Sequence, residues 1–456
     1  MGFGTPESTR SPDRQYRPEI DGLRALAVSA VIINHFGGNR LSSGYLGVDI
    51  FFVISGYVIT ASLLRQDSTD IKDLLSGFYT RRVKRILPAL LLFTAITAVL
   101  TCLVNPDPQD SIATGLAAVF GAANIQLREQ ATDYFAASTQ LNTFTHTWSL
   151  GVEEQFYLIY PVILWYCFKA KRSLTPLWIT IGSTLSLGCF LALSRIITGH
   201  LFGLFPGEIV GFIKSIGYLW PALLIPITAS LRLHHSARLN AILLIALFSL
   251  ASLVGFIFLY PTNQASAYFL MPCRFWELGS GCLLSLATAG PAKGITIRQR
   301  SLAMPALIGL LLVLFLPVDQ AVIATISAVA LSSLLILSLQ EGSAAYKLLT
   351  QKHLVQVGLI SYSLYLWHWG VLAISRWTIG IHPWTIPIQV SMMLAAAWAS
   401  YHWIERPLRR ASWAPLRSQT ISLGLGLMLV TAALLTGLER KGSALRSEEH
   451  TSELQS

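Results

Sequence analysis

The sequence predicts an all-α protein that crosses a membrane many times. Of its 456 residues, 53% are hydrophobic and only 12% are charged, whereas a soluble domain carries about 25% charged residues. The mean hydropathy is +0.56. Apolar runs recur along nearly the whole chain, and a run of about 20 residues is long enough to cross a hydrocarbon core of about 30 Å as a helix. These observations predict a polytopic transmembrane helical bundle.

The basic residues predict the topology of this bundle. They lie in short loops between apolar runs, and Lys and Arg in such loops mark the cytoplasmic side. The clusters are Arg10, Arg14 and Arg17; Arg81, Arg82, Lys84 and Arg85; Lys169, Lys171 and Arg172; Arg232 and Arg238; Lys293, Arg298 and Arg300; and Arg406, Arg409 and Arg410. The net charge of +10 is therefore spread over loops and does not form the continuous stripe of a nucleic-acid-binding protein.

Taking the basic loops as cytoplasmic gives about 13 crossings. We place them at residues 23–36, 46–64, 86–104, 147–168, 177–196, 209–231, 239–260, 274–289, 302–317, 319–339, 355–377, 385–404 and 418–438. The segment 111–127 is also apolar, but a crossing there would move the Lys169 cluster outside. We therefore expect this segment to be re-entrant or interfacial. Residues 1–18 form a polar, cytoplasmic tail, and no cleavage site follows the first apolar run.

Several common site types are absent from the sequence pattern. The five cysteines, Cys102, Cys167, Cys189, Cys273 and Cys282, lie in or beside apolar runs without a CxxC pair or zinc-ligand spacing. No Gly-rich phosphate loop follows a strand, and no GxSxG turn is present. We expect no disulfide framework, no metal and no bound cofactor, so the chemistry is expected to lie in the membrane helices.

The first predicted helix carries two ionisable side chains, Arg24 and His35. Eleven residues at about 1.5 Å rise and 100° per residue place them on one face, roughly 16 Å apart along the axis. An ionisable group within a spanning helix is costly and marks a candidate functional site, and a neutral imidazole can take a proton from a hydroxyl. The alternative is that Arg24 only anchors the helix and His35 is a hydrogen-bonded packing residue.

A second candidate is the arginine pair Arg82 and Arg85, just before the third crossing. The spacing i, i+3 places both on one helix face. Guanidinium groups bind phosphate oxygens with two parallel hydrogen bonds, so a phosphorylated donor at the inner surface would fit. The alternative is that these charges only set the topology.

Further ionisable side chains lie in or beside the predicted crossings. They are Asp49, His146, Glu153, Glu154, Arg274, Glu277 and His368. Adjacent carboxylates in a membrane segment need partners, such as an Arg, a His or water. For Glu153 and Glu154 we expect these to be supplied by Asp49 or by Arg274 with Glu277. A purely structural network of hydrogen bonds is the alternative for each of these residues.

Three segments carry distinctive motifs: Tyr16 to Val28 followed by His35, Gly44–Tyr57, and Phe78–Pro88. They are similar to the opening and to the second and third helix motifs of the acyltransferase 3 family of membrane-bound acyltransferases. The likeness continues in the segments 146–157, 275–281, 361–368 and 404–408 and covers most of residues 16–410. The resemblance implies a membrane acyltransferase domain over about residues 19–410, with a core of ten helices.

This resemblance implies transfer of an acyl group, usually acetyl, from acyl-CoA as co-substrate to a carbohydrate acceptor on the far side of the membrane. Arg24, Arg82 and Arg85 would hold the CoA phosphates. His35 would act as the general base on the acceptor hydroxyl or on an intermediate carrier group. We expect Glu153 or Asp49 to orient its imidazole. The acceptor stays open between lipopolysaccharide O-antigen, peptidoglycan, exopolysaccharide and small glycosides.

The chain departs from the family pattern in one region. Residues 174–260 hold about three crossings where one is usual, so we expect an extra helix pair in addition to the core and a C-terminal linking helix. Two other functions are open. The first is a transporter or flippase of lipid-linked sugars, although the sequence lacks the internal repeat that is common in transporters. The second is a non-catalytic membrane scaffold.

The C-terminal region carries two expectations. Residues 446–456 read as the translation of a sequencing adapter, so we exclude them from functional reasoning. Residues 411–445 are expected to form the linking transmembrane helix, which delivers the chain to the outer face. Many family members continue there into an SGNH-type hydrolase-like domain, and we expect one of about 200 residues in the intact protein.

Overall fold

The computed structural model describes residues 16–37, 41–66, 70–132, 139–169, 237–288 and 302–453. The longer helices are α1 (Pro18–Gly37), α2 (Gly47–Leu64), α3 (Ile71–Val104), α6 (Trp148–Lys169), α9 (Ala237–Leu259), α11 (Met271–Thr288), α13 (Ala321–Ser338), α15 (Lys352–Trp377), α16 (Ile386–Ala399) and α18 (Arg417–Glu453). The shorter helices are α4 (Gln109–Val119), α5 (Ala123–Thr132), α10 (Gln264–Phe269), α12 (Ala303–Val313), α14 (Ala344–Leu349) and α17 (Arg406–Arg410). The described residues contain no strand, which confirms the all-α prediction for this part of the chain.

Six helical segments of the described residues are long and apolar enough to cross a membrane. They are Gly44–Leu64, Ile71–Val104, Ala237–Leu259, Val318–Ser338, Lys352–Trp377 and Arg417–Arg440. Each coincides with one of the predicted crossings, although 239–260 and 319–339 extend one residue beyond the segments that match them. The predicted crossings 177–196 and 209–231 lie outside the described residues, so the expected extra helix pair stays a prediction. The polytopic architecture is therefore established, and the number of 13 crossings stays a prediction.

The segment predicted to be re-entrant or interfacial forms two short helices, α4 and α5. They meet at Gly121, whose φ of 66° lies in the left-handed region that glycine adopts without strain. Eleven helical residues extend only about 16 Å, which is too short for a crossing. The structure therefore contains no single spanning helix between residues 109 and 132.

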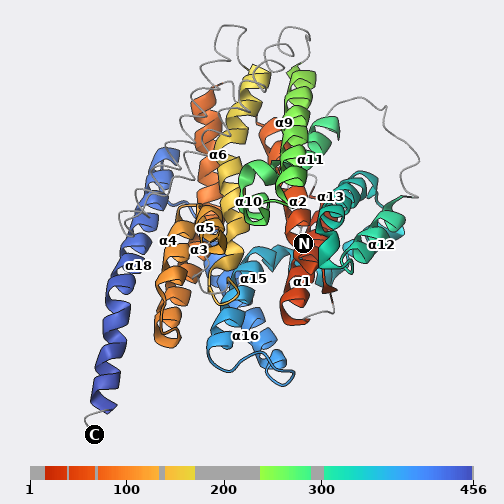
Figure 1. Ribbon diagram of the computed structural model, residues 1–456. Coiled ribbons are helices and arrows are strands. Elements are labelled where there is room, and N and C mark those ends of the chain that lie inside the picture. Colours follow the sequence, from red (N-terminus) through yellow and green to blue (C-terminus); the bar gives the residue numbers. More distant parts are fainter. Residues whose placement is uncertain are drawn as a thin grey trace, which may run out of the picture.

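Close helix crossings set the positions of the helices that carry the candidate residues. At Gly56 of α2 an added Cβ would lie 1.9 Å from the carbonyl oxygen of Leu278 in α11, and at Gly281 of α11 it would lie 2.0 Å from that of Val53. Gly358 of α15 similarly meets the Asp21 backbone of α1. Small residues permit such backbone approach between membrane helices. At Gly47 of α2 an added Cβ would lie 2.2 Å from the Ala27 carbonyl oxygen of α1. Helix α1 therefore packs closely against both α2 and α15 in the middle of the bundle (Figure 1).

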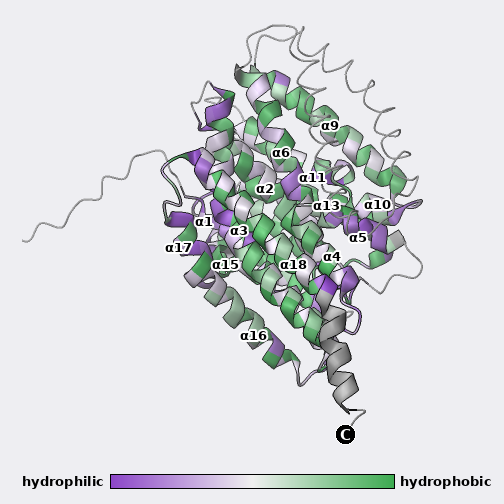
Figure 2. Ribbon diagram, turned by 90° about the vertical axis from the view of Figure 1, so that its left-hand side faces the viewer, coloured by the Kyte–Doolittle hydropathy of each residue, from purple (hydrophilic) through white to green (hydrophobic). Residues whose placement is uncertain are grey.

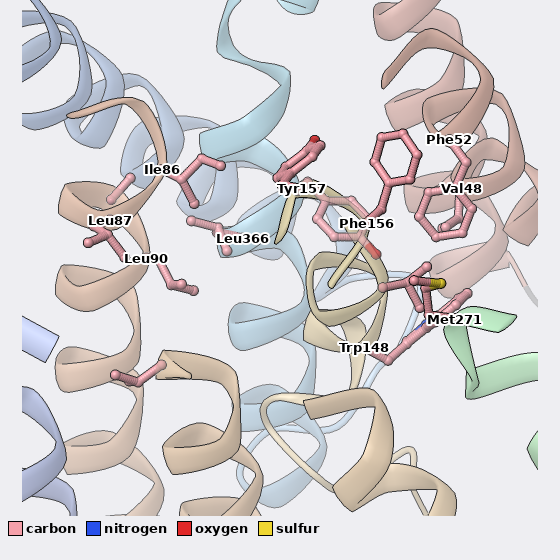
Figure 3. Close-up of a cluster of buried hydrophobic side chains, with 14 of the residues drawn as sticks. Val48, Phe52, Ile86, Leu87, Leu90, Trp148, Phe156, Tyr157, Met271 and Leu366 are labelled. Carbon is pink, nitrogen blue, oxygen red and sulfur yellow. The ribbon is translucent and has the colours of Figure 1, made fainter. Parts of the chain in front are cut away.

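The apolar side chains form a continuous core and a lipid-compatible surface. Figure 3 shows part of the core, in which Phe52 of α2, Ile86 of α3 and Phe156 of α6 lie among other buried side chains. Helix α18 runs along one side of the bundle (Figure 1) and is largely hydrophobic (Figure 2). Leu425, Leu429 and other apolar side chains of α18 are exposed on its outer surface. Such an apolar surface is expected to face lipid.

Candidate active site

The bundle encloses a cavity of about 1070 Å³ between α1, α2, α3, α6 and α15. This volume is at the upper end of the range of roughly 300–1,000 Å³ that is typical of small-molecule sites. Its charged lining consists of Arg17, Asp21, Arg24, Arg65, Arg81, Arg82, Arg85, Glu153 and Glu154. Six arginines face three carboxylates, so the cavity has a formal surplus of three positive charges.

The structure places Arg24, Arg82 and Arg85 in the wall of this one cavity. The guanidinium of Arg24 lies 3.2 Å from Asp21 Oδ1. That of Arg82 lies over the ring of Tyr157, 4.7 Å from its centroid. Helices α1 and α3 thus bring together two arginine groups that are separated by about 60 residues in the sequence. Their role in binding a phosphorylated donor stays a prediction.

Glu153 and Glu154 also line the cavity. Glu153 Oε1 accepts a hydrogen bond from Ser55 Oγ at 2.6 Å, and Oε2 accepts one from the Tyr157 hydroxyl at 2.7 Å. We expected Asp49, Arg274 or Glu277 to be the partners of these carboxylates. In the structure, the partners of Glu153 are the hydroxyl groups of Ser55 and Tyr157. Asp49 and Ser55 lie on the same helix but about 120° apart around its axis, so Asp49 faces another neighbour.

Asp49, Arg274 and Glu277 instead form a separate buried ion network between α2 and α11. Arg274 Nη1 donates to Asp49 Oδ1 at 2.8 Å and to Glu277 Oε1 at 2.6 Å, and Arg274 Nε donates to the Tyr268 carbonyl oxygen at 3.0 Å. The three charged side chains are at most 2% exposed. The expectation that Asp49 orients the His35 imidazole is therefore not supported, because its carboxylate is bound to Arg274.

A cluster of three histidines lies at the other end of α1. His35 Nδ1 lies 3.2 Å from His368 Nε2, and its ring contacts Trp369 edge-on with a centroid distance of 4.6 Å. His146, in the turn before α6, has its ring centroid 5.6 Å from that of His368. It is only 3% exposed, and neither of its ring nitrogens has a hydrogen-bond partner among the described residues. The hydrogen-bonding neighbour of His35 is His368. It is neither Glu153 nor Asp49, which we expected in this role.

The histidine cluster adjoins the cavity through Ser149 and Tyr365, which line it. The Tyr365 hydroxyl donates to the His146 carbonyl oxygen at 2.9 Å and lies 2.8 Å from Ser149 Oγ. The Tyr365 ring centroid lies 5.4 Å from those of His146 and His368. Neither hydroxyl was predicted from the sequence, where only acidic, basic and histidine side chains were singled out. Ser149 and Tyr365 lie three residues from His146 and His368, and in α15 this spacing places Tyr365 and His368 on one helix face; it is the signal that would have found them.

Glu405 was also missed, although the motif that contains it was noted. It ends a π-helical segment, Ser400–Glu405, and such segments often occur at functional sites. Its Oε2 accepts a hydrogen bond from Ser363 at 3.0 Å. Burial raises the pKa of the Glu405 carboxyl above its ordinary value, while the positive charges of Arg85, Arg409 and Arg24 oppose this rise. Glu405 therefore lies close enough to the cavity arginines to contribute to their electrostatic field.

Within the ranges that the structure describes, no group of three or more His, Cys, Asp or Glu side chains is arranged to hold a metal ion. The residues that the structure brings together are histidines, hydroxyl-bearing side chains and arginines.

Comparison with known proteins agrees with this arrangement. The family model described as "Acyltransferase domain" matches residues 17–276, more than half of the chain. The O-acetyltransferase OatA of Staphylococcus aureus is 28% identical over 432 residues, which are 90% of this chain and 59% of that protein. Two putative O-acetyltransferases of the same species are 28% and 29% identical, over 94% and 88% of this chain and 63% and 59% of their own length.

The chain thus spans about three fifths of the length of these curated relatives. No solved structure matches it. The family match includes Arg24, His35, Asp49, Arg82 and the segment from His146 to Glu154. This chain belongs to the acyltransferase 3 family.

Proposed function

We propose that this protein transfers an acyl group, in the simplest case acetyl, from cytoplasmic acyl-CoA to a hydroxyl of a carbohydrate outside the membrane. The observation that carries the proposal is the arginine-lined cavity, which shares Ser149 and Tyr365 with the histidine cluster. The cavity offers a site for an anionic donor, and the cluster offers a proton acceptor next to it. The names of the relatives, which are O-acetyltransferases, support the choice of acetyl and of an oxygen acceptor.

The charge of the cavity suits the donor. Coenzyme A carries several phosphate charges, and arginine forks bind phosphate oxygens in pairs. Arg24, Arg82 and Arg85 lie in the same wall, so the phosphates would occupy this region and the thioester would extend toward Ser149 and Tyr365. The formal surplus of three positive charges would be offset when the donor binds.

The proposed reaction needs only the thioester, the acceptor hydroxyl and a histidine that carries the proton. The acceptor oxygen attacks the thioester carbonyl carbon, the carbon–sulfur bond breaks, and CoA leaves as a thiolate. His35 takes the proton of the attacking hydroxyl, on the acceptor or on an intermediate carrier group, and this proton finally neutralises the thiolate. In a water-poor membrane interior such a proton transfer requires a positioned side chain.

A transfer assay tests the proposal and separates it from its rivals. Membranes that contain the protein are supplied with acetyl-CoA labelled in the acetyl group, together with cell-surface polysaccharide. We expect label in the polysaccharide and release of free CoA in equal amounts. A flippase of lipid-linked sugars would move its substrate without label, and a scaffold would produce neither result. Bound donor without release of free CoA and without any labelled product would refute acyl transfer.

The arginine pair of α3 provides a specific prediction about the donor. Arg82→Ala and Arg85→Ala should each weaken acetyl-CoA binding by roughly ten- to a hundredfold, since a charge-assisted hydrogen bond contributes about 1.5–3 kcal/mol. The measurement is calorimetric binding of acetyl-CoA to the purified protein in lipid nanodiscs. Arg410→Ala, an exposed arginine on α17, is the matched control and should bind normally. Unchanged binding in both cavity variants would show that the pair only sets topology.

We also propose an orientation in the bacterial cytoplasmic membrane, with about 13 crossings, the N-terminus inside and the end of α18 outside. The basic α17, with Arg409 and Arg410, would then be cytoplasmic, while His382 in the loop before α16 would lie outside. Single cysteines at Arg409 and at His382, in a variant that lacks the native cysteines, should react with a membrane-impermeant reagent from the cytoplasmic and outer side, respectively. The opposite pattern would invert the proposed map.

A further inference from the structure

The hydrogen bonds of His368 determine which nitrogen of each imidazole carries a proton. His368 Nδ1 lies 2.6 Å from the carbonyl oxygen of Tyr365. A carbonyl oxygen only accepts hydrogen bonds, so the neutral His368 ring carries its proton on Nδ1. Its Nε2 then has a lone pair and acts only as an acceptor.

The same logic extends to the neighbouring ring. His368 Nε2 lies 3.2 Å from His35 Nδ1, and two lone pairs cannot form a hydrogen bond. His35 Nδ1 must therefore carry the proton that is donated to His368. The lone pair of the neutral His35 ring is left on Nε2, which is the atom available to take a proton from a hydroxyl.

We propose that His368 is a positioning residue, which holds His35 in the Nδ1–H tautomer with Nε2 as the basic atom. The inference rests on the proposed function, in which His35 is the general base. In many enzymes a third group, often a carboxylate, accepts a hydrogen bond from the catalytic base and orients it. Here the neutral imidazole of His368 takes that place behind His35. When His35 takes a proton on Nε2, its bond to His368 is retained, so the charged form needs no rearrangement.

The surroundings hold this pair in place. His368 is fully buried, and the ring of Trp369 packs edge-on against His35. The crossing of α1 and α15 at Gly358 fixes the two helices that carry the imidazoles. Asp49 and Glu153, the carboxylates expected to orient His35, are bound to Arg274 and to two hydroxyls instead.

A spectroscopic experiment tests the tautomer without reference to activity. The full chain, with 15N-labelled histidine and in lipid nanodiscs, is examined by solid-state NMR at a pH at which the cluster is neutral. The signals that disappear in His35→Gln identify His35. We expect a protonated Nδ1 and an unprotonated Nε2, and His368→Phe should lose this preference. A His35 ring protonated on Nε2 in the unsubstituted protein would overturn the proposal.

Kinetics test whether the tautomer matters for transfer. His368→Phe keeps a ring but removes the acceptor, whereas the amide oxygen of His368→Gln can still accept from His35 Nδ1. We expect His368→Phe to lower kcat by about 10²-fold, the size of a general-base contribution, and His368→Gln to recover at least tenfold of this loss, with little change in the KM for acetyl-CoA. His382→Phe, in an exposed loop, is the control.

Two outcomes would contradict the positioning role. Equal losses in His368→Phe and His368→Gln would indicate packing alone, and full activity in His368→Phe would show that the hydrogen bond is dispensable. If the unsubstituted protein binds acetyl-CoA but transfers no acetyl group, the proposed function fails, and the NMR result still decides the tautomer.

Discussion

His35→Ala is expected to lower acetyl transfer by at least about 10²-fold, because it removes the proposed general base. The protein should still fold and insert, since the side chain is only half-buried at the end of α1. The hydrogen bond to His368 and the edge contact with Trp369 are the interactions that are lost. Acetyl-CoA binding should be unchanged, since the cavity arginines remain. The measurement is the transfer rate from labelled acetyl-CoA, together with donor affinity and the yield of monodisperse protein.

A neighbouring position on the same helix provides the control for this variant. Ile33 lies two residues earlier and is 49% exposed, so Ile33→Ala removes an apolar side chain at the same depth without touching the histidine cluster. It should transfer at the normal rate. A normal rate in His35→Ala as well would remove His35 from the chemistry, whereas a loss in both variants would point to a general disturbance of this end of α1.

Much of the fold follows from hydrophobic length alone. The predicted crossings 46–64, 239–260 and 355–377 agree within three residues with α2, α9 and α15. The reason is that a long apolar run in lipid forms a helix, in which the backbone N–H and C=O groups hydrogen-bond with one another. Helix α3 was predicted less well: it begins at Ile71 and not at residue 86. The apolar pattern marks the part of a helix inside the membrane, and α3 continues into a polar stretch where that signal is absent.

The candidate site was partly predictable for a different reason. Arg24 was found because a charged group inside an apolar helix is costly, and Arg82 because its spacing from Arg85 places two guanidinium groups on one helix face. Their neighbours could not be found this way. The bond between His35 and His368 joins residues 333 positions apart, and that between Asp49 and Arg274 joins residues 225 positions apart. Such pairs depend on which helix faces meet, and a single sequence carries no direct signal for this.

The buried ion network provides the prediction with the largest effect on stability. Arg274→Met leaves Asp49 and Glu277 at most 2% exposed without their cation, and the loss of one partner of a buried pair costs about 3–5 kcal/mol. The cation–π contacts of Arg274 with Tyr268 and Phe256 are lost as well. We expect a clear decrease in the free energy of unfolding, seen as a lower Tm and a poor yield of folded protein.

A compensated variant separates charge burial from loss of shape. Adding Asp49→Asn and Glu277→Gln to Arg274→Met removes both uncompensated charges and should recover most of the lost stability. Arg417→Met is the matched control, because its pair with Asp73 is more than half exposed and such surface pairs contribute about 0–1 kcal/mol. If the triple variant is as unstable as Arg274→Met, the network stabilises the α2–α11 contact by its shape and hydrogen bonds. If the Arg274→Met variant unfolds at the same temperature as the unsubstituted protein, the Arg274 guanidinium does not neutralise Asp49 and Glu277 in the folded protein.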